Sequence, residues 1–407
     1  MGVVTEEYIS EWSKIPVPLQ HQFFKHAQEE AERLRERILK FLKKLNRLKR
    51  ELEFRKIVEG EDWRDLRIAV IDGSFPPLAE RVGVRMGIFC AGYFIFEGNK
   101  LIPRDRGGAS YRSGIIAKTQ IGEPWKTGKI VELLCTKLER EIALYCLEEK
   151  GVDYVLIDGP FFGFQARCQL IREDKIDLPG YTYGSDLVDK VRDLSIELMR
   201  TRRAIAVIKR VRTMVFDGYI LYKTGKEEEC FDENDRAILT WIMPEKSYFA
   251  YRWLFGDTGV YQYYSNLRGV YHMYVKAHGQ PSSMDEILKI CRNVTNTRIY
   301  NNLNCDPNII LEATRYYVRC LSSMPPFCVE THKDVDISPI LEYFIAFYNP
   351  ATGLPFPIDL IDQEINLPRG MVREFVEEVE ARLLRFKDVK SPSISQYFAY
   401  IGIQKEE

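Results

Sequence analysis

The chain has 407 residues, of which 45% are hydrophobic, so it can bury a sizeable core and is not a disordered chain. Its 58 Lys and Arg residues against 59 Asp and Glu residues give a formal net charge of -1 at pH 7, which excludes a uniformly basic nucleic-acid-binding surface. The nine cysteines contain no C-x-x-C pair, which favours free thiols over a zinc site or a disulfide framework. No segment is apolar enough for a transmembrane helix, and we expect a cytoplasmic protein.

The pattern between residues 20 and 56 predicts one long helix. Apolar residues recur there with spacings of four and three, which is a heptad seam. Residues 31–56 contain eleven Lys or Arg against four Asp or Glu, so the flanks of the seam are basic. Three interpretations remain open: a solvated helix packed on its own domain, a coiled-coil or dimer arm, and direct contact with phosphate. The seam consists of Leu34, Ile38, Phe41, Leu45, Leu48 and Leu52.

Strands and helices alternate in the next part of the chain. Short apolar runs bounded by turn residues predict buried strands, and a 3.6-residue apolar period predicts helices between them. This alternation predicts an α/β layer with parallel strands. The expected strands are 66–71, 87–97 (one or two strands, before a hairpin turn at Gly98 and Asn99), 152–157 and 204–208, and the expected helices are 129–150 and 184–203.

The remainder of the chain is predicted to be aromatic-rich at first and then mostly helical. Helices are expected over 283–322, with an interruption at 301–307, and over 358–386, with a break near Pro368. The resulting division of the chain has an N-terminal helix, an α/β domain with a core completed by C-terminal elements, and a tail. The boundaries are 1–60, 61–390 and 391–407, with the core at 66–210, its completion at 340–390, and an aromatic-rich, helical insertion at about 211–339.

Two of the predicted strands end in the same way, in Asp72-Gly73 and in Asp158-Gly159. A carboxylate at the end of a buried strand is costly without a partner or a metal ion, and this edge of an open α/β sheet is where ligands bind. Carboxylate oxygens suit Mg²⁺ or Mn²⁺, and two such ions can clamp the attacking and leaving oxygens of a phosphodiester. One Asp-Gly alone is usually an ordinary turn. Two of them in one α/β unit indicate a shared site.

The order of these motifs resembles the NurA nucleases of archaea and some bacteria. The resemblance implies an RNase H-like mixed sheet flanked by helices, with a long N-terminal helix and an additional helical region. It covers most of the region from 66 to 365, and each motif is short, so that the specificity comes from their order and spacing. The matching stretches are IAVIDGS (68–74), LEREIALYCLEEKGVDYVLIDG (138–159), AIAVIKR (204–210) and GLPFPIDLIDQ (353–363).

The resemblance also implies roles for individual residues. Asp72 and Asp158 match the metal ligands at the two strand ends. Glu139 matches the family's helix glutamate better than Glu141, which stays open as an alternative because the apolar phase of the helix brings it near the buried face. The ordinary interpretation of either glutamate is a solvated helix residue. Lys209, after the third core strand, matches a lysine suited to holding a phosphate or the charge of the transition state.

The C-terminal part of the metal site departs from the family. Where the family often has a histidine or an acid after a Pro-x-Pro stretch, this chain has Asp362. Asp362 is therefore the expected fourth metal ligand, with Asp359 one turn away as an alternative. Tyr348 matches a family tyrosine near the metal less well, and core packing is its ordinary explanation.

Two groups of residues are candidates for contact with nucleic acid. A basic cluster beside the carboxylates would attract a phosphate backbone. Five tyrosines offer stacking platforms for single-stranded bases, although aromatic residues at such spacing more often belong to a core. The basic cluster consists of Arg202, Arg203, Lys209, Arg210 and Arg212, and the tyrosines are Tyr261, Tyr263, Tyr264, Tyr271 and Tyr274.

The expected activity is that of a divalent-metal-dependent deoxyribonuclease using Mn²⁺ or Mg²⁺. The resemblance implies 5′→3′ exonuclease and single-strand endonuclease activity in DNA end resection for homologous recombination, acting on single strands and duplex ends. It also implies a homodimer and a hexameric HerA-type ATPase translocase as partner. Two other functions remain open: an inactive RNase H-like module that binds DNA, and a glycoside hydrolase with paired acids, which would need no metal.

Overall fold

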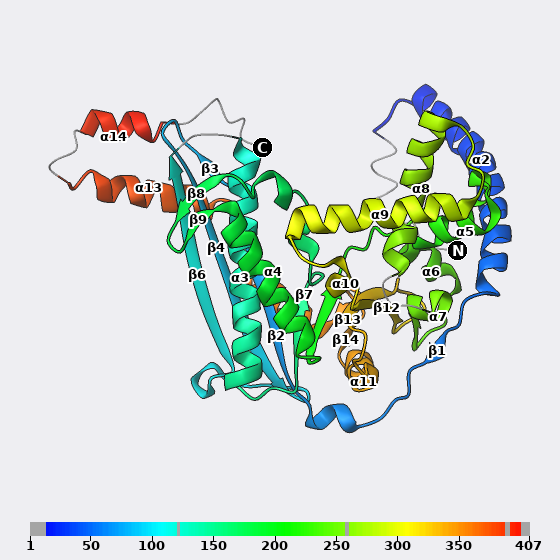
Figure 1. The fold of residues 1–407 in the computed structure, drawn as a ribbon, viewed down its shortest axis with the longest axis horizontal. Helices are drawn as coiled ribbons and strands as arrows, with labels where there is room; N and C mark the ends of the chain where they lie inside the picture. Colours follow the sequence, from blue (N-terminus) through cyan, green and yellow to red (C-terminus); the bar gives the residue numbers. More distant parts are fainter. Residues whose placement is uncertain (1–13, 120–122, 257–259, 387–390, 400–407) are drawn as a thin grey trace.

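The computed structural model describes residues 14–119, 123–256, 260–386 and 391–399 of the chain. These residues form a large mixed sheet flanked by helices, with a long N-terminal helix at one side (Figure 1), as predicted. The strands are β1 (Arg55–Lys56), β2 (Arg67–Ser74), β3 (Ala79–Glu80), β4 (Val84–Glu97), β5 (Lys100–Leu101), β6 (Ala109–Thr119), β7 (Tyr154–Asp158), β8 (Lys175–Leu178), β9 (Tyr181–Tyr183), β10 (Ala204–Ile208), β11 (Ser247–Ala250), β12 (Ala313–Arg319), β13 (Phe327–His332), β14 (Tyr348–Asn349) and β15 (Leu354–Pro355).

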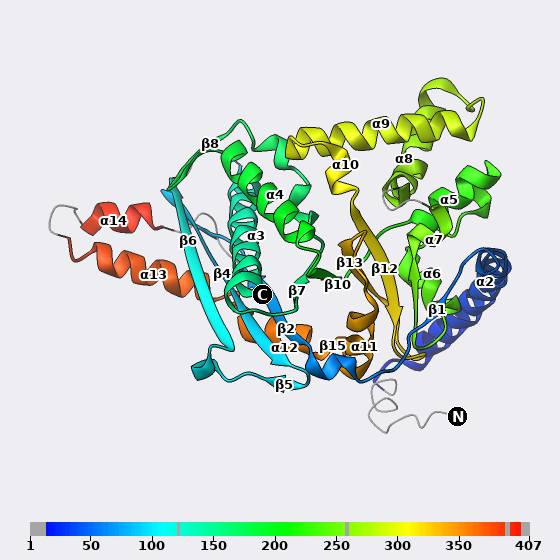
Figure 2. The same ribbon diagram turned by 60° about the horizontal axis from the view of Figure 1, so that its bottom comes forward.

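The helices lie on both faces of the sheet and at its far end (Figure 2). They are α2 (Val17–Lys49), α3 (Pro124–Glu149), α4 (Gly184–Arg200), α5 (Val215–Thr224), α6 (Asp235–Ile242), α7 (Tyr251–Phe255), α8 (Val260–His278), α9 (Met284–Leu303), α10 (Pro307–Ile310), α11 (Ser338–Ala346), α12 (Phe356–Ile365), α13 (Met371–Leu383) and α14 (Ser391–Tyr397), with short 3-10 turns η1 (Asp62–Asp65), η2 (Arg104–Arg106), η3 (Gly163–Gln165), η4 (Cys168–Leu170) and η5 (Glu227–Glu229).

The strand order β6–β4–β2–β7–β10 forms one half of the sheet, and β13, β12, β11 and β1 continue it beyond β10. β4 pairs antiparallel with β2 and β6, whereas β7 lies parallel between β2 and β10. This combination of antiparallel and parallel pairs is the predicted RNase H-like arrangement, and the predicted parallel strands are confirmed. The segment 87–97 belongs to one strand, β4, and the hairpin turn follows it because Glu97 pairs with Lys100.

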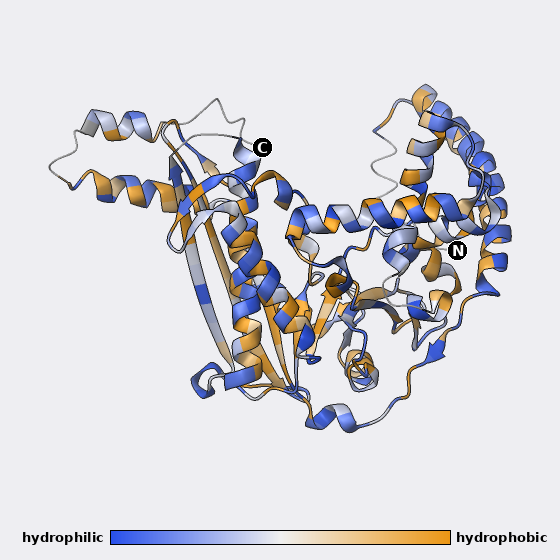
Figure 3. Cartoon of the chain, viewed as in Figure 1, coloured by the Kyte–Doolittle hydropathy of each residue, from blue (hydrophilic) through white to orange (hydrophobic). Residues whose placement is uncertain are grey.

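The central strands are continuous apolar runs because helices cover both faces of the sheet. In β2, Ala69 and Ile71 belong to the cluster formed with α3 and α4, while Ile68 and Val70 belong to the cluster formed with α11 and α12. Figure 3 shows the strands of this central region as largely hydrophobic ribbons. This packing fixes where each strand ends, and hence where the side chains at the strand ends meet.

The predicted helical character of 283–322 is wrong for the last part of this segment, which forms strand β12. β13, which had no counterpart in the prediction, pairs with β10, and β12 and β11 continue the same sheet. The insertion at about 211–339 is therefore only partly helical: its strands extend the core sheet, and its helices α5–α9 pack at the far end. The chain's division into domains stays a prediction. The predicted helical break near Pro368 is confirmed, between α12 and α13.

The long N-terminal helix is buried only near its C-terminal end. Leu45 and Leu48 are 2% and 3% exposed and pack with residues of α5, α6 and α8, whereas Leu34 and Ile38 are 41% and 45% exposed. The helix ends at Lys49, earlier than predicted, and Arg55 and Lys56 pair with β11. The packing on its own domain thus holds for one half of the seam, and the other half is free in the chain described.

Three further predictions concern the whole chain. All nine cysteines are free thiols, most of them buried. None of the helices in the described ranges combines the length and apolar character needed to cross a membrane. The predicted tail includes α14, whose neighbourhood contributes Ile394 and Phe398 to a small core with Val84 of β4. Residues 1–13 of the predicted N-terminal region and 400–407 of the tail lie outside the described residues.

Candidate metal site

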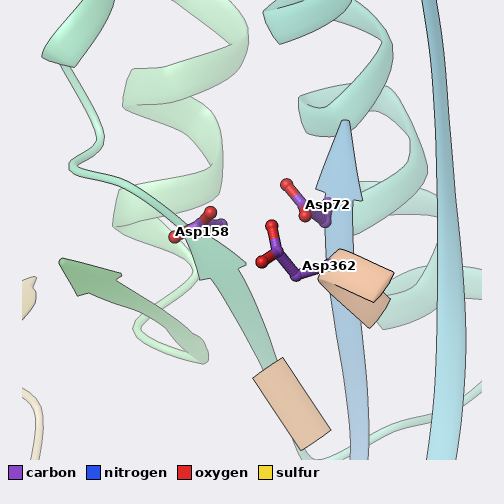
Figure 4. Close-up of side chains that lie close together, drawn as sticks. All are labelled: Asp72, Asp158 and Asp362. Atoms are coloured by element: carbon purple, nitrogen blue, oxygen red, sulfur yellow. The ribbon is translucent and has the colours of Figure 1, made fainter. Parts of the chain in front are cut away.

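The two strand-end aspartates lie next to each other because β2 and β7 are parallel neighbours. Ile71 pairs with Ile157, so the residues that follow them, Asp72 and Asp158, reach the same edge of the sheet. Asp72 is 7% exposed and Asp158 is half-buried. Figure 4 shows the side chains of both residues beside the ends of their strands, with that of Asp362 between them.

A third carboxylate reaches this edge from α12. α12 packs across β2, and the backbone N–H of Leu367, just beyond the helix, donates a 3.0 Å hydrogen bond to Ser74 Oγ. This contact gives the Ser of Asp72-Gly73-Ser74 a role in docking the C-terminal elements. One oxygen each of Asp72, Asp158 and Asp362 lies within 4.8 Å of the others (Figure 4). The Asp362 side chain is 58% exposed, so the cluster opens to solvent on its side.

Lys209 is the cation of the cluster. It follows β10, and its Nζ lies 3.0 Å from Asp158 Oδ2 and 3.1 Å from Asp362 Oδ1. Burial lowers the pKa of Lys209, but the two carboxylates outweigh it and the net shift is upward. The lysine is therefore charged at neutral pH, and it balances only one of the three aspartates.

Glu139 of α3 lies beside the cluster, and Glu141 does not. A Cβ atom at Gly73 would collide with Glu139 Oε1 and would lie 2.7 Å from Cys135 Sγ, so the glycine after Asp72 makes room for this side chain. The Glu139 side chain is 15% exposed. Glu141 instead pairs with Lys137, one turn earlier, at 2.8 Å, and its side chain is 31% exposed.

The crowded carboxylates shift one another's pKa values. Burial, followed by the charges of Asp158 and Glu139, raises the pKa of Asp72 to about 8, although Lys209 opposes this shift. Burial also raises the pKa of Glu139 to about 7, against the opposing charge of Arg140. The pKa of Asp158 is raised by burial as well. Such a group of oxygen ligands, costly to ionise by itself, has the chemistry that a hard divalent cation needs.

The raised pKa of Asp72 predicts a pH-dependent stability of the metal-free protein. Between its unfolded pKa of about 4 and its folded pKa of about 8, the folded state keeps a proton that the unfolded state has lost. Stability from this group therefore falls as pH rises through that window. We expect Asp72→Asn to raise the melting temperature in chelator, by an amount that grows from pH 5 to pH 8. A difference from wild type that stays constant over this range would contradict the assignment.

The two lower-ranked candidates near the C-terminus have other contacts. Asp359 is 7% exposed, and its Oδ2 accepts hydrogen bonds from Asn349 Nδ2 at 2.8 Å and from Thr352 Oγ1. It thus holds the turn between β14 and β15. The ring of Tyr348 stacks on Phe327 at a centroid distance of 6.5 Å, and burial raises the pKa of Tyr348 to about 12. The hydrogen bonds of Asp359 and the ring contact of Tyr348 therefore give each residue a structural role.

The predicted basic cluster is split between the two ends of β10. Arg202 pairs with Asp334 at 2.8 Å, and Arg203 Nε donates to the backbone oxygen of Asp153 at 3.0 Å, both before the strand begins. Lys209, Arg210 and Arg212 follow the strand, about 20 Å away at roughly 3.3 Å per residue. Of the five, Lys209 contacts the carboxylates, and Arg210 and Arg212 lie one and three residues further along the chain. Arg210 and Arg212 are exposed and form no ion pair with any described residue.

The favoured interpretation of the five tyrosines, core packing, is confirmed for four of them, and the alternative of base stacking does not hold for those four. Tyr261, Tyr263, Tyr264 and Tyr271 are between 2% and 8% exposed and belong to the core of the helical region. Tyr274 is half-buried and donates a hydrogen bond to Glu286 at 2.9 Å. The aromatic residues at this spacing fill the interior between helices.

Sequence reasoning missed Arg140, which is 2% exposed. Its Nη2 donates to the backbone oxygen of Pro160 at 3.4 Å, and its Nη1 lies 3.6 Å from Glu139 Oε2, while Nε and Nη1 lack hydrogen-bond partners within the described chain. Arg140 links the helix that carries Glu139 to the loop after Asp158. In the sequence it lies in a run of charged residues that looks like a solvated helix face, and nothing there signals its burial.

Comparison with known proteins identifies the fold. No sequence-family model and no curated protein matches the chain. Among solved structures, the NurA nuclease from Sulfolobus solfataricus matches with a TM-score of 0.54 and 13% identity, over 92% of this chain and 100% of that one. A NurA structure with manganese matches with a TM-score of 0.47 and 13% identity over 88% and 99%, and endonuclease V from Bacillus subtilis with 0.29 and 11% over 83% and 93%. From the first of these matches, the chain has the fold of a NurA nuclease.

Proposed function

We propose that the chain is a divalent-metal-dependent DNA nuclease. The observation that carries the proposal is the cluster of Asp72, Asp158 and Asp362 with Lys209, at the carboxyl ends of the parallel strands. Three clustered carboxylates, of which Asp72 is buried and Asp158 half-buried, share one lysine, and this arrangement fits a bound cation better than a purely structural role. The fold that the chain shares with a NurA nuclease supports the same activity.

The aspartates, with Glu139, would hold Mn²⁺ or Mg²⁺, which when bound lowers the pKa of a water nucleophile and stabilises the leaving 3′ oxygen. Lys209 carries a fixed positive charge between Asp158 and Asp362, where it can stabilise negative charge on a phosphate. Arg210 and Arg212 follow it on the exposed side and attract the DNA backbone. Substrate reaches the site from the side of Asp362, whose carboxylate is the most exposed of the three.

The narrower activity rests on the resemblance to NurA. We propose 5′→3′ exonuclease and single-strand endonuclease activity in DNA end resection, with a HerA-type hexameric ATPase supplying translocation. The proposed arrangement includes a homodimer. The exposed half of the seam on α2, with basic residues around it, supports docking to a second chain because an apolar stripe on a helix favours burial.

Digestion of circular single-stranded DNA and of linear duplex tests the nuclease. We expect both to shorten with Mn²⁺ and to stay intact with chelator. DNA that binds in a gel-shift assay but remains intact with Mn²⁺ and with Mg²⁺ would indicate the inactive binding module. Hydrolysis of glycosides that chelator does not inhibit would indicate paired acid–base carboxylates instead.

Replacing Leu34 and Ile38 with Asp tests the dimer. Both side chains are exposed in the single chain, so the charges add no buried group to it and its melting temperature should change little. If the seam pairs with a second copy, light scattering should show monomers. Met273→Asp, at an exposed apolar position of α8, serves as the control and should leave the dimer intact. A double variant that remains dimeric would exclude this face as the dimer contact.

A further inference from the structure

A pocket with both polar and apolar walls lies beyond the strand end that carries Asp158. Its volume is about 360 Å³, and its walls come from the loop after β7, from α8 and α9, and from β12 and β13. Pro160, two residues after Asp158, lines it, and Arg298 and Arg315 contribute cations. Consecutive Cα atoms are ~3.8 Å apart, so the pocket begins within ~8 Å of the Asp158 backbone.

Arg315 is held in the pocket with part of its hydrogen-bonding capacity unused. Its Nε donates to Glu330 Oε2 at 2.8 Å, and Glu330 Oε1 accepts from the backbone N–H of Phe161 at 3.0 Å. Its Cζ lies 5.5 Å from the centre of the Tyr261 ring. The two terminal nitrogens of Arg315 form no hydrogen bond with described residues, and the side chain is 16% exposed. A guanidinium fixed in this way presents a fork suited to phosphate oxygens.

The other polar groups of the pocket complement an anion. Arg298 is exposed on α9, and its Nη2 lies 3.4 Å from Asn266 Oδ1. The pocket therefore contains two arginines against one carboxylate, and the carboxylate of Glu330 is fully engaged by Arg315 and Phe161. Tyr261 and Gln262 also line the pocket from the first turn of α8, near the positive end of that helix.

One loop connects this pocket to the candidate metal site. On one side of the loop, Arg140 Nη2 donates to the backbone oxygen of Pro160, beside Glu139. On the other side, the backbone N–H of Phe161 donates to Glu330, beside Arg315. The segment Pro160–Phe161, two to three residues beyond Asp158, thus joins the wall of the pocket to the strand end that carries this aspartate.

We propose that this pocket binds the terminal 5′-phosphate of a DNA strand and positions the strand for removal of nucleotides from that end. The proposal rests on the proposed nuclease function. In that reaction the oxygen of water joins the phosphorus, the bond from phosphorus to the 3′ oxygen breaks, and the 3′ oxygen takes up a proton. The shortened strand then carries a new 5′-phosphate, so each cut regenerates the group that the pocket binds. A terminal monoester also carries more negative charge at neutral pH than an internal diester, because its second pKa is about 6.

The test compares three single-stranded oligonucleotides of one sequence, ending in a 5′-phosphate, a 5′-hydroxyl or a 3′-phosphate. Binding to the full chain is measured by fluorescence anisotropy in chelator, and initial digestion rates are measured with Mn²⁺. We expect the 5′-phosphate to favour binding and digestion by about ten-fold over the other two ends, as a charge-assisted, forked contact should. The ratio should fall towards one in Arg298→Gln and in Arg315→Lys, which keeps a cation beside Glu330. Arg292→Gln, an exposed position of the same helix outside the pocket, should retain the ratio.

Equal binding and digestion of the three oligonucleotides would overturn the proposal. If circular single-stranded DNA is still cut with Mn²⁺ in that case, the nuclease function stands and only the phosphate pocket fails. If no DNA is cut under any condition, the nuclease function fails, and the anisotropy ratio alone decides whether the pocket binds a phosphate end. If Arg315→Lys does not fold, as judged by circular dichroism, the result with Arg298→Gln decides.

Discussion

Asp72→Asn and Asp158→Asn should each lower nuclease activity by about 10²–10³-fold or more, the loss typical when a group that stabilises transition-state charge is removed. Each substitution keeps the shape of the side chain and removes a charge that the site needs for its cation. The fold should persist, because the raised pKa of Asp72 means that its negative charge destabilises the metal-free protein. Removing that charge therefore costs no stability. Initial rates with Mn²⁺ and circular dichroism spectra check both statements.

Asp359→Asn provides the matched control for these variants. Asp359 lies one turn from Asp362 in the same helix, but its carboxylate accepts hydrogen bonds from Asn349 and Thr352. We therefore expect Asp359→Asn to lower the melting temperature and to leave most of the activity. Near-normal rates in Asp72→Asn or Asp158→Asn would sink the proposed site, and a loss confined to Asp359→Asn would move it to the turn between β14 and β15.

Glu139→Gln should cost far more activity than Glu141→Gln. Glu139 fits into the space left by Gly73 beside Asp72, whereas Glu141 is directed to Lys137 on the outer part of α3. The two substitutions remove the same charge from positions half a turn apart, so each serves as the control for the other. Digestion rates at increasing Mn²⁺ concentrations give the measurement, and we expect Glu139→Gln also to need more metal.

The reverse order of effects would show that the site glutamate is Glu141. Equal small effects would remove α3 from the site altogether. Gly73→Ala adds an independent check, because its Cβ would displace the Glu139 side chain without changing any charge. Gly73→Ala should reproduce part of the loss of activity seen with Glu139→Gln. Its effect on activity should add to that of Glu141→Gln when the two substitutions are combined.

The strands that carry the site could be predicted from the sequence. β2, β7 and β10 are short apolar runs that end in Asp72, Asp158 and Lys209, and strands buried on both faces have this composition wherever they lie. The parallel pairing follows from the helices between them. The position of Asp362 was found only by resemblance to a family, because nothing in residues 353–363 indicates which sheet edge they approach.

Other parts of the fold gave no local signal. β12 and β13 are buried on both faces and lack the alternation of a half-buried strand, so helix and strand could not be told apart by periodicity. The aromatic residues of α8 are similar: the spacing that would expose a row of rings also fills an interior once α5 and α9 pack around it. A heptad seam likewise predicts that an apolar stripe is buried, but it does not indicate which surface covers the stripe. In this structure α2 is covered over only part of its length.

The sequence by itself determined the composition of the site: aspartates after buried strands, a lysine after another, and glutamates on the intervening helix. Only the tertiary structure decided which of these meet. The register of β2 against β7 joined Asp72 to Asp158, and the docking of α12 through Ser74 added Asp362. The extended strand β10 separates Arg202 and Arg203, at its start, from Lys209, at its end, by the length of the strand. Residues distant in the chain come together only where packing across the sheet brings them.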